Sequence, residues 1–337
     1  MRLAATALVV GVAAMGCARG APPAGGEAPV LVQIPLRVPP RTPEQVRQDR
    51  RSGIGRLTVP GLDESAGNRA ALGRRIFFSP DFGAGGSAAC TRCHNADHAG
   101  AGGLQSLAGA ETLAVPPIVN LSAYESFGTD GRSHKLVEYM ASHLAQLNAG
   151  IEEKDRDAAL ETAYGPALRG LFPFAEGDTA PALTAMVSRS LAAYLGTLVT
   201  ASPIDGFLAG NDGAISPQAG RGFDLFFEKG CVSCHDGPVF GGRKMATLGL
   251  SMPWPGDVPL GEHAEYKQRR QRRVSSLRTV ALTAPYFHES AIDTLPAAVE
   301  LMALHQLGVT LAADERDAIV AFLQSMVGTP PPSFHAP

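Results

Sequence analysis

Two stretches decide the fold, Cys90-Thr91-Arg92-Cys93-His94 and Cys231-Val232-Ser233-Cys234-His235. Both read C-x-x-C-H, the pattern through which c-type haem is attached to a chain. Two thiols one helical turn apart reach the two vinyl groups of one haem, and the next residue brings an imidazole beneath the iron. Neither a zinc site nor a thioredoxin-type pair explains a histidine after both pairs. We therefore expect two covalently bound haem c groups, with His94 and His235 as axial ligands of their irons.

The residues before the two motifs also repeat. Gly73–Phe78 (GRRIFF) precedes the first motif and Gly222–Phe227 (GFDLFF) precedes the second. Each is typical of an amphipathic helix that ends in aromatic side chains. Because a haem is itself the core of such a domain, these phenylalanines are expected to pack against its edge.

The remaining chain favours helices over strands. Apolar residues recur at helical spacing after Thr42, Ser133, Thr179, Ser216 and Thr294, and again from Ile319 to Met326. Gly- and Pro-rich stretches at 83–117 and 237–261 are expected to be loops. The predicted fold is mostly α, with two cytochrome c-like haem domains in tandem and long irregular loops. We place the domains at residues 61–205 and 206–330.

The N-terminus is typical of an exported protein. Residues 1–17 combine Arg2, an apolar run too short to span a bilayer, and small residues before Cys17. This pattern indicates a lipoprotein signal that would leave a lipid anchor on Cys17, and an ordinary cleaved signal is the alternative. Residues 18–60, rich in Ala, Pro and Gly at their start, are predicted to form a tether. The expected location is the periplasm, on a membrane-tethered chain.

Bulk composition narrows the class of partner. The chain has 337 residues, 45% of them hydrophobic, and a formal net charge of −3. These values fit a globular protein of two domains, and they argue against a nucleic-acid partner.

The longest informative stretch, Ser276 to His288 (SLRTVALTAPYFH), resembles a signature of the bacterial di-haem cytochrome c peroxidase family, which includes the MauG-type enzymes. The resemblance extends from about Leu72 to Met326. It implies that the first haem reacts with hydrogen peroxide and that the second relays electrons from a small cytochrome c or cupredoxin. It also implies a possible homodimer.

The resemblance assigns roles around the second haem. Met302, 14 residues after His288, matches the methionine that binds the iron opposite the histidine, and such ligation raises a haem potential. His288 itself matches a position close to this haem. Arg278 matches a position from which a guanidinium can hold a haem propionate.

A calcium ion is a further implication of the resemblance. The backbone carbonyls of Thr283 and Pro285 match positions that hold calcium between the family's domains. Ala114, however, stands where the family has an asparagine ligand.

Around the first haem the family pattern breaks. No histidine lies near Ala110, where many members place a second axial ligand, so a five-coordinate iron is the simplest expectation. Thr129 replaces the family's tryptophan between the haems. The family's distal glutamine and glutamate correspond to Tyr139 and Ala149.

Three residues are therefore candidates for the distal acid or base, namely Glu152, Glu153 and His143. Met140 is a further candidate, as an iron ligand. Besides a peroxidase, the sequence leaves two alternatives open: a MauG-type oxidase that modifies side chains of a partner protein, and a di-haem electron carrier without enzymatic activity. Met140 or His143 bound to the first iron would favour the carrier.

Overall fold

The structure, a computed structural model, describes residues 41–79, 90–105, 113–148, 152–173, 182–255, 271–287 and 290–335. Residues 42–337 form one compact unit. Cys17, Ala110, Ala149 and His288 lie outside the described residues. In the part of the chain that the structure describes, no helix is both long enough and apolar enough to cross a membrane.

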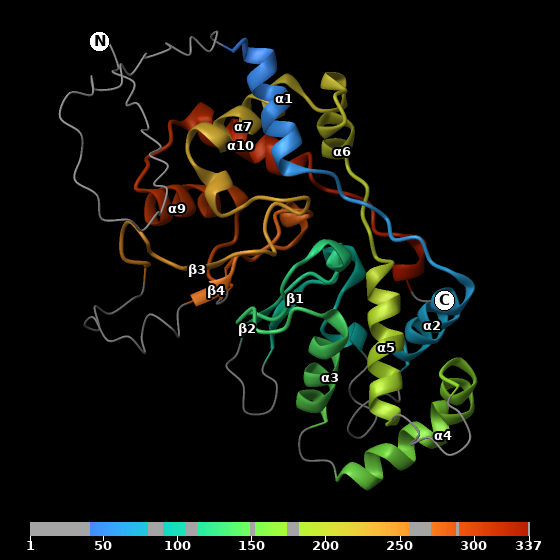
Figure 1. The fold of residues 1–337 in the computed structure, drawn as a ribbon. Coiled ribbons are helices and arrows are strands. Elements are labelled where there is room, and N and C mark those ends of the chain that lie inside the picture. Colours follow the sequence, from blue (N-terminus) through green and yellow to red (C-terminus); the bar gives the residue numbers. More distant parts are fainter. Residues whose placement is uncertain are drawn as a thin grey trace, which may run out of the picture. The chain divides into compact units, whose positions relative to one another are not determined.

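The first half is built from four helices and a short hairpin (Figure 1). The helices are α2 (Glu64–Phe77), α3 (Leu136–Leu147), α4 (Glu153–Leu171) and α5 (Leu183–Gly196). Strands β1 (Gly102–Gln105) and β2 (Leu113–Val115) are antiparallel, with Gly102 opposite Val115. The Cys90–Arg92 turn lies between α2 and β1.

The second half repeats this plan. Its helices are α6 (Pro203–Leu208), α7 (Pro217–Glu228), α9 (Leu295–Leu307) and α10 (Ala313–Gln324). Strands β3 (Met245–Thr247) and β4 (Gln271–Arg273) form a second antiparallel pair, with Met245 opposite Arg273. The prediction of a mostly helical chain is confirmed.

In each half a glycine permits two helices to cross closely. A Cβ added to Gly73 of α2 would lie 2.0 Å from the carbonyl oxygen of Ser190 in α5. A Cβ added to Gly222 of α7 would lie 1.9 Å from the carbonyl oxygen of Ala318 in α10. Only hydrogen fits at such distances, so both GxxxFF segments are fixed by the crossing as well as by their phenylalanines.

Buried apolar side chains form two clusters. One is centred on α2, α3 and α5 and includes Phe77, Leu191 and Tyr194. The other is centred on α7 and α10 and includes Phe226 and Phe322. In the sequence, helices of the first cluster lie on both sides of the first motif, and helices of the second cluster lie on both sides of the second motif.

The chain ends cross between the halves, which corrects part of the predicted tether. Residues 43–54 form α1 (Pro43–Ile54), capped by Thr42, and Ile54 is buried in the second cluster. At the other end, Phe334 is buried in the first cluster, and the carbonyl of Ser333 accepts from Tyr194 and Arg74. The helix after Thr42 agrees with the predicted cap, whereas the three arginines that hold α1 on the second half were not recognised from the sequence.

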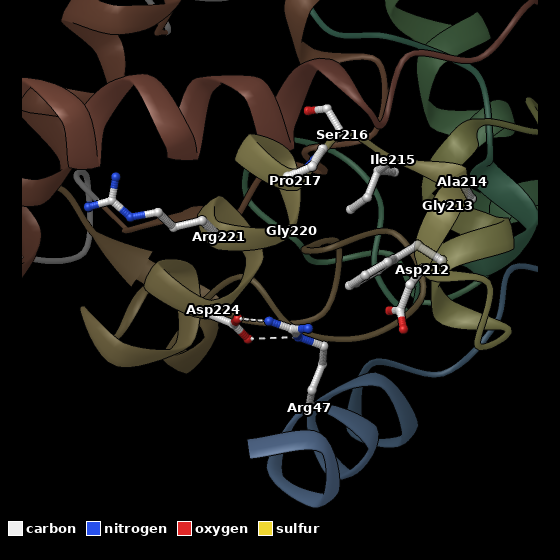
Figure 2. Close-up of a pocket in the computed structure, with 11 residues that line it drawn as sticks. Arg47, Asp212, Gly213, Ala214, Ile215, Ser216, Pro217, Gly220, Arg221 and Asp224 are labelled. Carbon is white, nitrogen blue, oxygen red and sulfur yellow. Dashed lines mark hydrogen bonds and ion pairs between the residues drawn. The ribbon is translucent and has the colours of Figure 1, made fainter.

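Ion pairs hold α1 on the second half. Arg47 and Arg50 both bind Asp224 of α7, and buried Arg51 pairs with Asp212. Figure 2 shows Arg47 reaching from α1 to Asp224 across an open hollow that Ile215, Pro217 and Gly220 also line. No cysteine or histidine of either motif lines this hollow, so it is not the haem site.

Helix boundaries follow local signals. Ser216 and Thr294 cap α7 and α9, as predicted, whereas α3 begins at Leu136 rather than Ser133. Helix α4 was not predicted, because Pro166 interrupts its sequence and its apolar residues form no clear stripe. Of the predicted loops, 83–117 contains β1 and β2, and 237–261 contains β3.

Candidate haem sites

The two C-x-x-C-H motifs adopt the same backbone turn. Cys90–Arg92 and Cys231–Ser233 are single 3₁₀ turns. The amide of His94 donates to the carbonyl of Cys90 at 2.9 Å, and that of His235 donates to Cys231 at 3.0 Å. In this geometry each turn carries its two cysteines and its histidine together, as attachment of one haem requires.

The thiols of the two motifs are free. All four motif cysteines lack disulfide bonds. Burial raises the pKa of Cys90 to about 12 and the pKa of Cys231 to about 11. Two thiols that are buried against a core and free to react suit thioether formation, and they do not suit a redox dithiol, which needs a lowered pKa.

A backbone carbonyl orients each histidine ring. Nδ1 of His94 lies 2.7 Å from the carbonyl oxygen of Gly100, and Nδ1 of His235 lies 3.2 Å from that of Phe240. With Nδ1–H donating, the lone pair is on Nε2, which is then available to iron. Desolvation lowers the pKa of His94 to about 4 and also lowers that of His235, so both imidazoles are neutral at neutral pH.

Aromatic side chains surround both histidines. The Phe77 ring lies 6.5 Å from the His94 ring and contacts Phe78 and Tyr194. In the second half, Phe226 packs edge-on against Phe240, the residue whose carbonyl faces His235. The structure thus places the Phe-Phe pairs beside the motifs, where the sequence predicts them.

Of the distal candidates, the structure brings His143 to the first site. The centres of the His143 and His94 rings are 6.5 Å apart. His143 projects from α3, and Tyr139, one turn earlier, stacks on it at 5.9 Å and 22°. Met140 lies in the first core cluster.

Glu152 and Glu153 lie elsewhere. Both are exposed at the start of α4, and Glu153 pairs with Arg156 of its own helix. The structure shows both side chains exposed on α4 rather than beside His94 or His143, so it lends no support to their assignment as distal groups.

Met302 lies in α9, the helix beside the second motif. A Cβ on Gly230, the residue before Cys231, would lie 3.8 Å from Leu307 in the same helix. His305, one turn after Met302, packs its ring against Trp254 at 5.5 Å and its Nδ1 lies 2.7 Å from the carbonyl of Pro253. Trp254 is therefore a packed loop residue.

Arg278 has a different partner from the one predicted. Its guanidinium is fully buried and binds both carboxylate oxygens of Asp205, at 3.0 and 2.6 Å. It also donates to the carbonyl of Pro238 at 2.7 Å. Asp205 is a partner that sequence reasoning missed and that only the Ser202–Asp205 capping box marks. The contact of Arg278 with a haem propionate stays a prediction.

Arg273 is the arginine that fits a propionate. Its Nε donates to the carbonyl of Gly128 at 2.9 Å, but its Nη1 is buried and has no hydrogen-bond partner. A buried guanidinium nitrogen without an acceptor is costly unless an anion completes it. It lies beside Thr129, whose carbonyl accepts from the Arg273 amide, at the position where the family has its tryptophan.

The candidate calcium site consists of the backbone carbonyls of Thr283 and Pro285. Thr283 and Pro285 follow the 3₁₀ turn Val280–Leu282, and the Thr283 hydroxyl donates to the carbonyl of Val280. Within the described ranges, no group of three or more His, Cys, Asp or Glu side chains converges on a metal-sized space.

Together these features define a class. Two turns each present two free thiols and an oriented neutral imidazole, aromatic cores flank both, and one buried nitrogen of Arg273 lacks an acceptor that an anion such as a propionate would supply. The residues therefore fit two c-type haems, and the protein is a di-haem c-type cytochrome. Cytochromes of this class differ in what faces the second side of each iron.

Comparisons with known proteins give the particular family. The family described as "Di-haem cytochrome c peroxidase" matches residues 67–213. The cytochrome c551 peroxidase of Nitrosomonas europaea is 30% identical over 78% of this chain and 80% of its own length. The chain belongs to the di-haem cytochrome c peroxidase family.

Relatives of the MauG type are also similar. The methylamine utilization protein MauG of Methylorubrum extorquens is 26% identical over 78% of this chain and 79% of its own length. A solved structure described as a MauG-like protein associated with microbial copper homeostasis shares the fold, with a TM-score of 0.66 and 20% identity. It covers 84% of this chain and 97% of the other.

Proposed function

We propose that this protein reduces hydrogen peroxide to water with electrons from a small redox protein. Membership of the family supports the proposal, since the cytochrome c551 peroxidase of Nitrosomonas europaea shares 30% identity over most of both chains. Overall, hydrogen peroxide takes up two electrons and two protons to give two molecules of water. The bound haems supply the redox chemistry, and the protein supplies attachment, ligation and proton placement.

The observation that carries the proposal is the pairing of two unlike haem sites in one chain. In the first site the His143 ring lies near the His94 ring and stacks on Tyr139, whereas Leu307 of α9, the helix that carries Met302, lies beside Gly230 at the second motif. A methionine ligand raises a haem potential, which suits an electron-relaying haem. The first site, with an ionisable imidazole instead, suits proton-coupled chemistry.

His143 is the proposed distal acid and base of the first site. Burial lowers its pKa, so the ring is neutral at neutral pH and can accept a proton from peroxide before returning it. Tyr139, which stacks on it, has a raised pKa and stays protonated. No carboxylate takes this role in the proposal, because Glu152 and Glu153 are on the surface of α4.

The test is an activity assay in which the protein is mixed with a reduced small cytochrome c and hydrogen peroxide. Oxidation of the small cytochrome c is followed by absorbance. We expect peroxide-dependent oxidation of the cytochrome in the wild type. We expect a loss of about a hundredfold in His143→Ala, within the range typical of proton-transfer catalysis. Absence of turnover with any cytochrome or cupredoxin donor, before and after partial reduction, would leave the electron carrier as the better reading.

A MauG-type oxidase is the second candidate. Its support is the similarity to MauG of Methylorubrum extorquens and the absence of the family's glutamine and glutamate at Tyr139 and Ala149. Peroxide-dependent modification of a partner protein, without turnover of a cytochrome donor, would favour it.

Three further proposals concern the cellular location, the calcium content and the oligomeric state of the protein. Export to the periplasm with a lipid on Cys17 rests on the sequence of residues 1–17 and is tested by mass spectrometry of the mature N-terminus. Calcium at the Thr283 and Pro285 carbonyls is tested by metal analysis before and after chelation. A homodimer is tested by sedimentation.

A further inference from the structure

The two halves share one register beyond their haem motifs. Phe127 pairs with Ser133 in an isolated bridge, and Tyr286 pairs with Ile292 in the same way. Helix α3 begins at Leu136 and helix α9 at Leu295, three residues after each bridge. Each of these positions in the second half lies 159 residues after its counterpart in the first half.

The preceding turns keep the same spacing. The 3₁₀ turn Leu121–Ala123 corresponds to Val280–Leu282. Each turn follows a residue in the left-handed region, Asn120 at φ 61° and Thr279 at φ 62°. The register therefore holds from Asn120 to the α3 helix without an insertion.

This register assigns His143 a counterpart. Adding 159 to 143 gives 302, so His143 occupies in α3 the position that Met302 occupies in α9. By the same count Met140 corresponds to Val299, so Met140 is not the equivalent of the methionine ligand.

The ring geometry points the same way independently. The centres of the His94 and His143 rings are 6.5 Å apart. Two imidazoles bound to opposite sides of one metal ion, each with a metal–nitrogen bond of about 2 Å, have ring centres roughly 6 Å apart. The Nδ1 of His94 is hydrogen-bonded to the carbonyl of Gly100, so Nε2 is the ring nitrogen that remains available to a metal ion.

We infer that His143 is the sixth ligand of the first iron, which in the resting oxidised protein is bound by two histidines. The first haem is then not open, as the sequence suggests, but capped by a residue of a helix. A His143 imidazole released from the iron would be free to act as the acid and base described above. This last step rests on the proposed function, whereas the coordination does not.

The experiment is spectroscopy of the intact di-haem protein with both irons oxidised. We expect low-spin EPR signals from both haems, and near-infrared magnetic circular dichroism bands for one bis-histidine and one histidine–methionine haem. His143→Gly should convert one haem to high spin, and added imidazole should restore the low-spin signal. His98→Ala, which removes the exposed histidine nearest in sequence to His94, should leave the spectra unchanged.

A high-spin first haem in the wild type, or a His143→Gly spectrum identical to the wild type, would overturn the assignment. His143→Met tests it without a cavity, because two histidine–methionine bands should then appear. Stopped-flow mixing with peroxide separates the two proposals. A bis-histidine protein that never reacts with peroxide leaves the ligand assigned and removes the peroxidase, and a reactive protein with a high-spin first haem does the opposite.

A row of stacked aromatic rings leads from the first haem site toward the second half of the chain. Four rings follow one another in the first half: Tyr124 and Phe127 at 6.3 Å and 16°, Phe127 and Tyr139 at 6.3 Å and 23°, and Tyr139 and His143 at 5.9 Å and 22°. We name this set the aromatic stack. It ends at His143, the residue inferred to bind the first iron.

The other end of the aromatic stack touches the second half. A Cβ on Gly242 would lie 3.2 Å from Cγ of Tyr124, and the Arg273 guanidinium lies 5.0 Å from the Tyr124 ring centre. Gly242 belongs to the loop that starts at His235 and carries the Phe240 carbonyl facing its Nδ1. The aromatic stack thus runs from His143 on α3 to the loop that follows His235.

The geometry points to the aromatic stack as the electron route between the haems, in place of the tryptophan that Thr129 replaces. One electron leaves the reduced second haem and arrives at the oxidised first haem, and the four side chains end as they began. Contiguous π systems couple donor and acceptor better than the same distance of aliphatic side chains, because their orbitals lie closer in energy to the transferring electron.

The test is laser-flash photoreduction of the intact protein, in which the transfer between haems is followed by absorbance. Tyr139→Leu should slow the transfer by about an order of magnitude with both haem potentials unchanged, and Tyr139→Phe, which keeps the ring, should restore it. Tyr164→Leu removes a buried tyrosine of the same core outside the stack and should transfer like the wild type. Equal rates in Tyr139→Leu and Tyr164→Leu would rule the route out.

Discussion

The guanidinium of Arg278 holds both carboxylate oxygens of Asp205, across 73 residues of sequence, at 3.0 and 2.6 Å. The arginine is fully buried and the carboxylate is about one-third exposed. Asp205 lies in the first turn of α6, directly after the linker between the halves, while Arg278 precedes the turn that leads to α9. This pair ties the start of the second half to the segment that positions the second haem.

Removing the carboxylate should be costly, because it leaves the Arg278 charge buried and unpaired. We expect Asp205→Asn to lower the free energy of unfolding by about 3 kcal/mol, the range found when one partner of a buried pair is removed. Urea unfolding of the intact protein measures it. Asp314→Asn, which removes an exposed partner of Arg221, should change little.

The same pair predicts a dependence on pH. Burial alone would raise the pKa of Asp205, but hydrogen bonds and the charge of Arg278 outweigh burial and lower it. A lowered pKa in the folded state stabilises the protein above the unfolded pKa, about 3.9 for aspartate. This stability is lost as the pH falls through the folded value. In Asp205→Asn this part of the acid sensitivity should disappear, and an unchanged acid unfolding curve would contradict it.

Two glycines of one helix give a matched comparison. A Cβ added to Gly222 would lie 1.9 Å from a backbone oxygen of α10, whereas a Cβ added to Gly220 would have no atom within 4 Å. Gly222→Ala should cost about 2–3 kcal/mol, because α7 and α10 must separate. Gly220→Ala should stabilise by about 0.5–1 kcal/mol through helix propensity. Thermal unfolding of both variants is the measurement, and equal effects would refute the close crossing.

Haem attachment is testable site by site. Replacing Cys90 and Cys93 by alanine should leave one covalent haem per chain instead of two, and the same should hold for Cys231 and Cys234. The pyridine haemochrome assay counts them after denaturing purification. A retained second haem in either double variant would show that the thiols of the motif do not hold it.

The position of α1 rests on the carboxylate of Asp224, which binds Arg47 and Arg50. In Asp224→Ala, hydrogen exchange of the α1 amides should be roughly fivefold faster, corresponding to about 1 kcal/mol for a partly exposed pair. Asp314→Ala, at an exposed carboxylate that pairs with Arg221, is the control. Unchanged exchange in α1 would mean that Arg51 and Ile54 suffice to hold the helix.

Much of this architecture is visible in the sequence because it depends on local spacing. The two C-x-x-C-H turns, the glycine and phenylalanine positions before them, and the caps at Thr42, Ser216 and Thr294 each need only a few neighbouring residues. His143 was one of several distal candidates for the same reason, since it lies on the inward stripe of α3. What selected it was the register between α3 and α9, which requires the helix starts.

The rest depends on contacts between distant segments. Nothing in the sequence near Arg278 indicates that Asp205 will neutralise it, so this ion pair could not be predicted. Likewise Glu152 and Glu153 look available until α4 places them on its exposed first turn. Residues 43–54 have the composition of a linker, and only their arginines, paired with acids about 160 to 180 residues away, make them part of a core.

The crossing of the chain ends has a consequence for the independence of the halves. Because α1 completes the second core and Phe334 completes the first, each half is closed by a strap that the opposite end of the polypeptide provides. Cutting the chain at the linker gives two fragments that each lack their own strap and carry the other's. We therefore expect a fragment with a single haem motif to fold fully only if its strap is grafted back onto it.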